Sequence, residues 1–264
     1  MMATGEARVT QREWTAVDPG IGVLGEFQVL CDGQPKPART RQVARLGALL
    51  AAAPGQTVTR DRIIEALWAD KPPQTAVNTI QVHISQLRLL VGSDLIATTG
   101  QGYAMEVQAD RVDAEWFRHQ VLTCLDHPVN GDAGQVKQVL HQALDLWRGD
   151  PYEDLNDGLI EARRSELREL RERAIELYLD VSLALAESPR EIGEVIADAR
   201  GQVARQPLRE RGHEILIRAL IREENRAQAA QAYQQAIEVF AEQAGVTASP
   251  RLRRAVDPVL RGET

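Results

Sequence analysis

The stretch AVNTIQVHISQLRLLVG, residues 76–92, carries side chains suited to reading DNA. At 100° per residue, one face of a helix here holds only apolar side chains, namely Ile80, Ile84, Leu87 and Val91. A second stripe follows the same spacing a third of a turn away and holds Thr79, Val82, His83 and Gln86. Gln and His can hydrogen-bond base edges, and Val and Thr methyls can touch thymine, so we predict that this stripe faces the bases of a major groove.

Polar side chains lie on the flank between these two stripes, around the back of the helix. Asn78, Ser85 and Arg88 have the donors that hold phosphates on either side of a groove. Arg39 and Arg41, just before the first of three predicted helices, and Arg60 in the second are further candidates for contacts with the DNA backbone. An ordinary surface helix and solvated arginines without a partner explain the same residues, and composition alone leaves both interpretations open.

The elements around this helix are those of a compact unit of three helices and a hairpin. Residues 41–56 place four apolar side chains on one helical face, and Thr59 is an N-cap for a helix with Ile63 and Leu67 buried. Pro72-Pro73 forces a turn, after which Thr75 can cap the helix quoted above. Two or three small strands are expected in residues 20–37 and a hairpin in 95–107. This order predicts a winged helix.

Charge is distributed unevenly along the chain of 264 residues, whose net charge is −7. Residues 36–88 hold eight cations and three anions, or +5, whereas residues 114–264 hold 20 cations and 26 anions, or −6. A basic N-terminal segment joined to an acidic one fits a nucleic-acid partner. Only three of the 31 cations are lysine; arginine suits phosphate, but a GC-rich genome produces the same bias.

From Asp113 on, nearly every segment is helical, and strand signals vanish. Ala184-Leu185 and Ala219-Leu220 are 35 residues apart, and Ala199 and Tyr233 are 34 apart, which fits tetratricopeptide-like hairpins, although a generic helical bundle remains open. We therefore expect a mainly α fold with a small β component: a flexible tail (1–17), a winged helix-turn-helix domain (18–112) and an all-α tetratricopeptide-like domain (113–264).

Several kinds of chemistry have no motif in this sequence. There is no phosphate-binding GxxxxGK[ST], no HExxH and no GxSxG, so we expect neither an enzyme nor a cofactor. His119 and Cys124 share a helix at a spacing more typical of packing than of a metal site, and we expect no metal. No run of 18 apolar residues or signal peptide is present, which predicts a cytoplasmic, nucleoid-associated protein with no membrane partner.

Six segments together resemble the Streptomyces antibiotic regulatory protein family, in which an OmpR-type winged helix precedes a bacterial transcriptional activation domain. The segments are GVLGEFQV, VTRDRIIEALWADKPPQTAVNTIQVHISQLRLLVG, TTGQGYAMEV, LWRGDPYEDL, LIRALIREENRAQAAQAYQQ and EQAGVTASPRLR, in the family's order over residues 20–254. Val77 and Gln86 depart from the family, which often has arginine there, and the wing tip lacks an arginine.

The resemblance implies a transcriptional activator of secondary-metabolite (antibiotic) genes that binds direct repeats in double-stranded promoter DNA. It implies pairing as a homodimer on DNA and contact with RNA polymerase holoenzyme, including the sigma factor. It places the major-groove helix at Thr75 to Val91 and the wing tip at Thr98 to Tyr103, with DNA contacts from Thr75, Thr98, Thr99, Gln101 and Tyr103. Two alternatives stay open: a helical-repeat adaptor whose winged helix does not bind DNA, and a ligand-sensing regulator.

Overall fold

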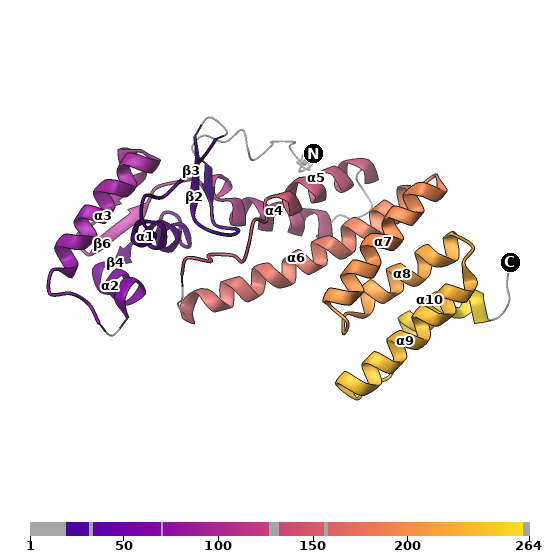
Figure 1. Cartoon of the computed structure of the whole chain (residues 1–264). Coiled ribbons are helices and arrows are strands. Elements are labelled where there is room, and N and C mark those ends of the chain that lie inside the picture. Colours follow the sequence, from indigo (N-terminus) through magenta and orange to yellow (C-terminus); the bar gives the residue numbers. More distant parts are fainter. Residues whose placement is uncertain (1–19, 32–33, 70, 127–131, 156–157, 261–264) are drawn as a thin grey trace, which may run out of the picture. The chain divides into compact units, whose positions relative to one another are not determined.

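The structure, a computed structural model, describes residues 20–31, 34–69, 71–126, 132–155 and 158–260 (Figure 1). These residues form two compact units, one within 1–126 and 139–172 and the other within 127–138 and 173–264. The predicted domain boundary between residues 112 and 113 thus falls inside the first unit. The predicted tail, residues 1–17, lies outside the described residues. Among the described residues, no helix is both long and apolar enough to cross a membrane.

The first unit opens with a three-stranded antiparallel sheet of order β1-β2-β3. Its strands are β1 (Gly20–Gly22), β2 (Gln28–Cys31) and β3 (Gln34–Pro37). Strand β3 is exposed along its whole length, and its two prolines fit an edge strand because proline has no N–H for a further neighbour. The side chain of Phe27, just before β2, is buried and lies on Gly47 of the first helix.

Three helices follow: α1 (Arg41–Ala51), α2 (Arg60–Trp68) and α3 (Ala76–Val91). Thr40 caps α1 and Thr59 caps α2, each accepting a hydrogen bond from a backbone N–H in the first turn. Thr75 occupies the N-cap position of α3, but its side chain makes no capping hydrogen bond, so the predicted cap is wrong in that respect. The predicted apolar faces are buried, including Leu46, Leu50, Ile63 and Leu67.

A second sheet, of order β4-β6-β5, forms the wing. It comprises β4 (Val58–Thr59), β5 (Ile96–Thr98) and β6 (Gly102–Met105). A Cβ on Gly102 would lie 1.9 Å from the Val58 carbonyl oxygen, so only glycine lets β4 and β6 come this close. The three helices and this hairpin give the predicted winged helix-turn-helix.

Asp113, the first residue of α4 (Asp113–Asp126), binds the N-terminal sheet although it follows the wing in sequence. It is completely buried, and its carboxylate accepts hydrogen bonds from the backbone N–H groups of Val23 (2.8 Å) and Leu24 (3.1 Å). Arg148 Nη2 donates to the same carboxylate at 2.9 Å. Burial raises the pKa of Asp113, whereas Arg148 and the two N–H groups favour its charged form.

Helices α5 (Ala133–Asp145) and α6 (Gly158–Leu185) contribute residues to both units. The second unit continues with α7 (Pro189–Arg205), α8 (Glu210–Arg222), α9 (Arg226–Ala244) and α10 (Pro250–Leu260). Helix α8 packs against α7, α9 and α10. Ala199, Ala219 and Tyr233 are buried at these contacts, whereas Ala184 and Leu185 are exposed and lie at no crossing. The predicted mainly helical fold, with a tetratricopeptide-like second part, is confirmed.

Candidate nucleic-acid interface

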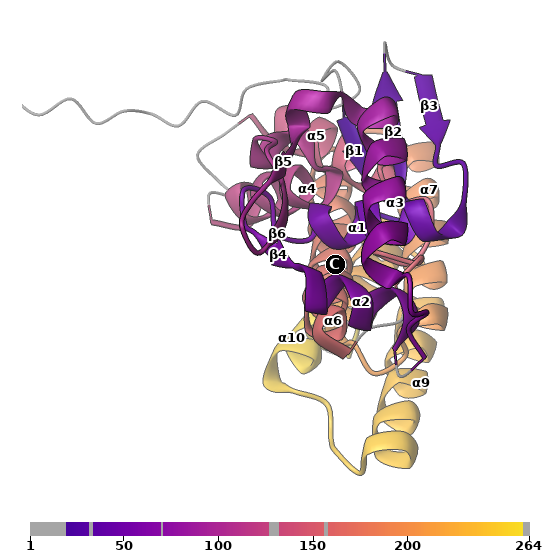
Figure 2. The same ribbon diagram turned by 90° about the vertical axis from the view of Figure 1, so that its left-hand side faces the viewer.

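The outermost side of α3 lies opposite its buried face. Ile80, Ile84, Leu87 and Val91 are all buried, as the pattern predicts. Half a turn away, the spacing i, i+4, i+7 and i+11 aligns four exposed side chains, which we call the crest of α3: Asn78, Val82, Ser85 and Leu89. Val82 is 55% exposed and Leu89 83%. Figure 2 views the first unit from the side on which α3 lies, with β5 and β6 beside it.

The stripe predicted to face bases lies mostly on a flank of the helix. Of its four members only Val82 is on the crest; Thr79, His83 and Gln86 are half-buried. The Thr79 hydroxyl donates to the Thr75 carbonyl, and Gln86 Oε1 is buried with no hydrogen-bond partner among the described residues. Burial lowers the pKa of His83, whose Nδ1 is also buried without a hydrogen-bond partner among the described residues. The structure thus does not expose Gln86 as a base-reading amide.

Asn78 and Ser85, predicted to face phosphates, lie instead on the crest, at the positions that would enter a groove first. The Ser85 hydroxyl donates to the Gln81 carbonyl at 2.9 Å. On the flank beyond them, Gln81 and Val77 are exposed, and the prediction did not include them. Periodicity alone does not predict their exposure, because at 100° per residue Val77 and Gln81 lie about 60° and about 100° from Ile80, on a flank and not opposite the buried face.

Arg88 does not extend freely toward a phosphate. Its Nε and Nη2 both donate to the carbonyl of Ile96, at 3.1 and 2.7 Å, and Nη2 also donates to Thr98 Oγ1 at 2.8 Å. Both acceptors belong to β5, so the guanidinium joins α3 to the wing. The guanidinium thus makes contacts within the protein, and the phosphate contact of Arg88 stays a prediction.

The wing turns over Thr99, Gly100 and Gln101. Thr98 and Gln101 are exposed, and the half-buried Thr99 closes the turn by accepting a hydrogen bond from the Gly102 N–H at 3.0 Å. Tyr103 was assigned to the DNA surface, and this assignment is wrong. Only 4% of it is exposed, because it lies in the central strand of the sheet, opposite Val58 and Thr98.

The remaining predicted cations have different surroundings. Arg60 holds the wing tip: its backbone N–H donates to the Gln101 carbonyl, and its Nη1 to the Gly100 carbonyl. Arg39, in the link between β3 and α1, is exposed, as is Thr75 before α3. This geometry tests neither the predicted phosphate contact of Arg39 nor the predicted DNA contact of Thr75.

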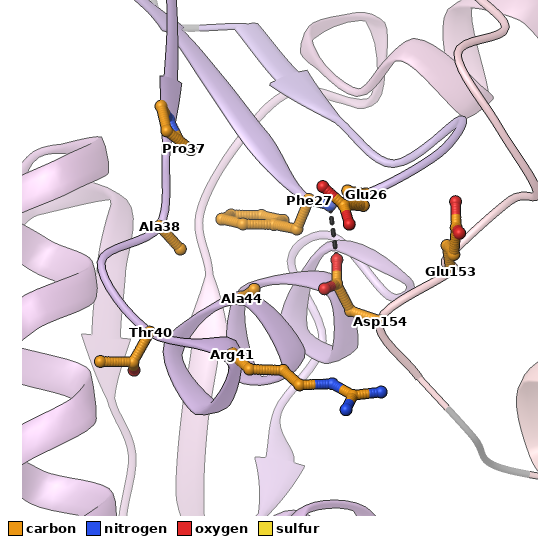
Figure 3. Close-up of a pocket in the computed structure, with 9 residues that line it drawn as sticks. All are labelled: Glu26, Phe27, Pro37, Ala38, Thr40, Arg41, Ala44, Glu153 and Asp154. Carbon is orange, nitrogen blue, oxygen red and sulfur yellow. Dashed lines mark hydrogen bonds between the residues drawn. The ribbon is translucent and has the colours of Figure 1, made fainter.

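Arg41 lies in a cavity of about 370 Å³ at the start of α1. The cavity is lined by Glu26, Phe27, Pro37, Ala38, Thr40, Arg41, Ala44, Glu153 and Asp154. In Figure 3 the Arg41 side chain extends on the same side of the cavity as Asp154. The Asp154 carboxylate accepts a hydrogen bond from the Phe27 N–H. Three carboxylates, those of Glu26, Glu153 and Asp154, line the same cavity as Arg41. Among the described residues, no group of three His, Cys, Asp or Glu side chains is arranged to hold a metal ion.

Two family models match the chain. The model of the bacterial transcriptional activator domain matches residues 112–260. The model described as transcriptional regulatory protein, C terminal, matches residues 34–105, which include α1 to α3 and the wing.

Curated proteins of similar sequence are named as regulators. The regulatory protein AfsR of Streptomyces griseus is 29% identical over 239 residues, which are 89% of this chain and 23% of AfsR. The regulatory protein DnrI of Streptomyces peucetius is 26% identical over 255 residues, 92% of each protein. This chain therefore spans about a quarter of AfsR and nearly all of DnrI.

A solved structure has the same fold over nearly the whole chain. It is Mycobacterium tuberculosis EmbR in complex with a low affinity phosphopeptide, with a TM-score of 0.81 and 26% sequence identity. The match covers 93% of this chain and 66% of that one.

Proposed function

This chain belongs to the Streptomyces antibiotic regulatory protein family, and on that premise we propose that it is a sequence-specific DNA-binding transcriptional activator. The observation that carries the proposal is the exposed crest of α3 beside a wing fixed by Arg88 and Arg60. A convex helix flanked by a hairpin is the shape that fits a major groove and the adjacent backbone.

Electrostatics around α3 support a duplex as the ligand. The surplus of five positive charges in residues 36–88 lies in the segment that carries all three helices of the winged helix. The first turn of α3 has no acidic side chain and no side-chain cap, so the positive end of the helix dipole suits a phosphate, although the Ala76 N–H already donates to the Pro73 carbonyl. The affinity for DNA should therefore fall steeply as salt increases.

The remaining parts of the proposal come from the family. Direct repeats, pairing of two copies on DNA and recruitment of RNA polymerase holoenzyme are what the resemblance implies for this chain. The names of AfsR and DnrI, as regulatory proteins, agree with that role. Antibiotic genes are the proposed targets.

Selection of bound duplexes from a random DNA library, followed by footprinting, tests DNA recognition. We expect a protected pair of direct repeats and a linear fall of log affinity with log salt. No shift of any duplex at low salt would contradict the proposal and favour the helical-repeat adaptor. Transcription in vitro with RNA polymerase holoenzyme then tests activation: a promoter carrying the selected repeats should respond to the protein, and the same promoter with scrambled repeats should not.

A further inference from the structure

Large hydrophobic side chains are exposed on α3 more than elsewhere in the described chain. Six such side chains are exposed among the described residues, and three of them, Val77, Val82 and Leu89, belong to this one helix of 16 residues. Val82 and Leu89 lie on the crest itself, with Ser85 between them. Because a surface helix normally turns polar side chains to water, this concentration indicates a surface that is covered in use.

The geometry of the crest limits what can cover it. Val82 and Leu89 are seven residues apart, which is about 10.5 Å along the helix axis at 1.5 Å per residue. Successive bases of one strand rise about 3.4 Å along the duplex axis, so these two side chains can reach bases up to about three steps apart.

Among base edges in a major groove, the C5-methyl of thymine is the apolar group. The other edges present donors or acceptors, which Val or Leu would bury without a hydrogen bond, at a cost in affinity. Valine and leucine on the crest therefore favour thymine over the other three bases. The polar side chains nearby, Asn78, Gln81 and Ser85, can bond the remaining edges, and glutamine in particular fits adenine.

We propose that Val82 and Leu89 are specificity-determining residues that contact thymine methyl groups about three base steps apart in each half of the operator. The inference rests on the proposed function, since it names the base groups that the same surface binds. It replaces the half-buried Gln86 with two exposed apolar side chains as the main readers of the groove.

The test removes one methyl group at a time from DNA. The probe is the tightest duplex selected from a random library, in which each thymine in turn is replaced by deoxyuridine, which lacks only the C5-methyl. We expect two positions in each half-site to lose affinity, by about three- to fourfold each, as burial of one methyl predicts.

Protein variants then assign each methyl to a side chain. Val82→Ala should bind the parent duplex more weakly and become insensitive to deoxyuridine at one position, and Leu89→Ala at the other. Val246→Ala is the matched control, since Val246 is 52% exposed, close to the 55% of Val82, but follows α9. It should keep the full sensitivity at both positions. All three side chains are exposed, so thermal unfolding should be unchanged in each variant.

Three results would overturn the proposal. If deoxyuridine weakens binding at no position while the footprint persists, methyl groups are not read, yet the proposed function stands. If the sensitivity survives in Val82→Ala and Leu89→Ala, another part of the protein contacts the methyls. If the parent protein selects no duplex but self-associates through α3, so that Leu89→Ala makes it monomeric, the crest is a protein interface and the proposed function fails as well.

Discussion

The guanidinium of Arg88 and the carbonyl of Ile96 form a two-pronged hydrogen bond that fixes the wing to the proposed recognition helix. The acceptor is the first residue of β5, and Thr98, two residues on, receives a third bond from the same group. Together with Arg60, which bonds the wing tip, this planar side chain holds the hairpin beside α3. We therefore expect Arg88 to be a positioning residue, which acts on DNA through the wing.

Arg88→Lys separates positioning from a direct phosphate contact. Lysine keeps the charge but lacks the planar fork that reaches Ile96 and Thr98 together, so we expect about tenfold weaker binding and loss of the footprint beside the wing. The dependence of log affinity on log salt should stay unchanged. Thr98→Val, which removes one acceptor, should shift the footprint in the same direction by less. If Arg88→Lys instead binds like the parent protein and Arg88→Ala lowers the salt slope by about 0.9, Arg88 contacts a phosphate directly.

Arg39→Ala should reduce the salt dependence of DNA binding, which Arg88→Lys should leave unchanged. Arg39 is exposed in the link before α1, and as a phosphate contact it would contribute equally to every sequence. We expect affinity for selected and unrelated duplexes to fall by similar factors and the salt slope to decrease by about 0.9. Titrations of both duplexes at several salt concentrations measure this. Arg254→Ala, an exposed arginine of α10, is the control that should change neither quantity.

Gly47→Ala and Gly193→Ala should change stability with opposite signs, although both glycines are inside helices. A Cβ at Gly47 would lie 2.4 Å from Phe27 Cζ, so alanine must displace the buried Phe27 ring. We expect a loss of about 1–3 kcal/mol. At Gly193 of α7 no atom lies within 4 Å of the added methyl, and alanine should stabilise by about 0.5–1 kcal/mol. Urea unfolding of each variant checks both signs, and an unchanged or raised stability of Gly47→Ala would contradict the contact between α1 and Phe27.

The free energy of unfolding should fall as the pH is lowered, because His213 is protonated more readily in the unfolded chain. Burial lowers the pKa of this histidine from its ordinary value of 6.5, although the bond from Nε2 to the Pro207 carbonyl and the carboxylate of Glu210 act in the other direction. The unfolded chain therefore takes up the proton first. The stabilisation is complete above pH 6.5 and is lost as the pH falls from there through the folded-state pKa, at up to about 1.4 kcal/mol per pH unit.

Urea unfolding of the parent protein and of His213→Asn between pH 7.5 and 5 measures this loss. The variant, although less stable, should lose less stability across that range. His119→Asn, at an exposed position of α4, should keep the parent's pH dependence. Equal slopes for the parent protein and His213→Asn would show that another group takes up the proton.

The helices and strands of the first unit could be predicted because their signals are local. Thr40 and Thr59 cap their helices through residues three positions away, and the apolar face of α3 is fixed by a period of 3.6 residues. The predicted stripe and the exposed crest of α3 differ by about 80°, or somewhat less than a quarter of a turn. Periodicity identifies the buried face but not which flank neighbouring elements also cover, so it does not predict that Thr79, His83 and Gln86 are half-buried.

The partners of charged residues could not be predicted in the same way. Arg88 and Ile96 are eight residues apart, but their contact depends on the angle at which β5 returns beside α3. Asp113 and Val23 are 90 positions apart, and no local pattern connects them. Tyr103 was assigned from its place in a family segment, whereas its burial depends on the central position of β6 in the sheet.

The carboxylate of Asp113 has a consequence for chimeras built from members of this family. In a chimera joined between residues 112 and 113, positions 113 and 148 would come from the other parent. The N–H groups of Val23 and Leu24 would then depend on the residue that this parent has at position 113. Tyr152 extends the same attachment, since its N–H donates to the Val23 carbonyl. A chimera that takes residues 20–155 from a single parent keeps Asp113, Arg148 and Tyr152 together with the backbone groups that they bind.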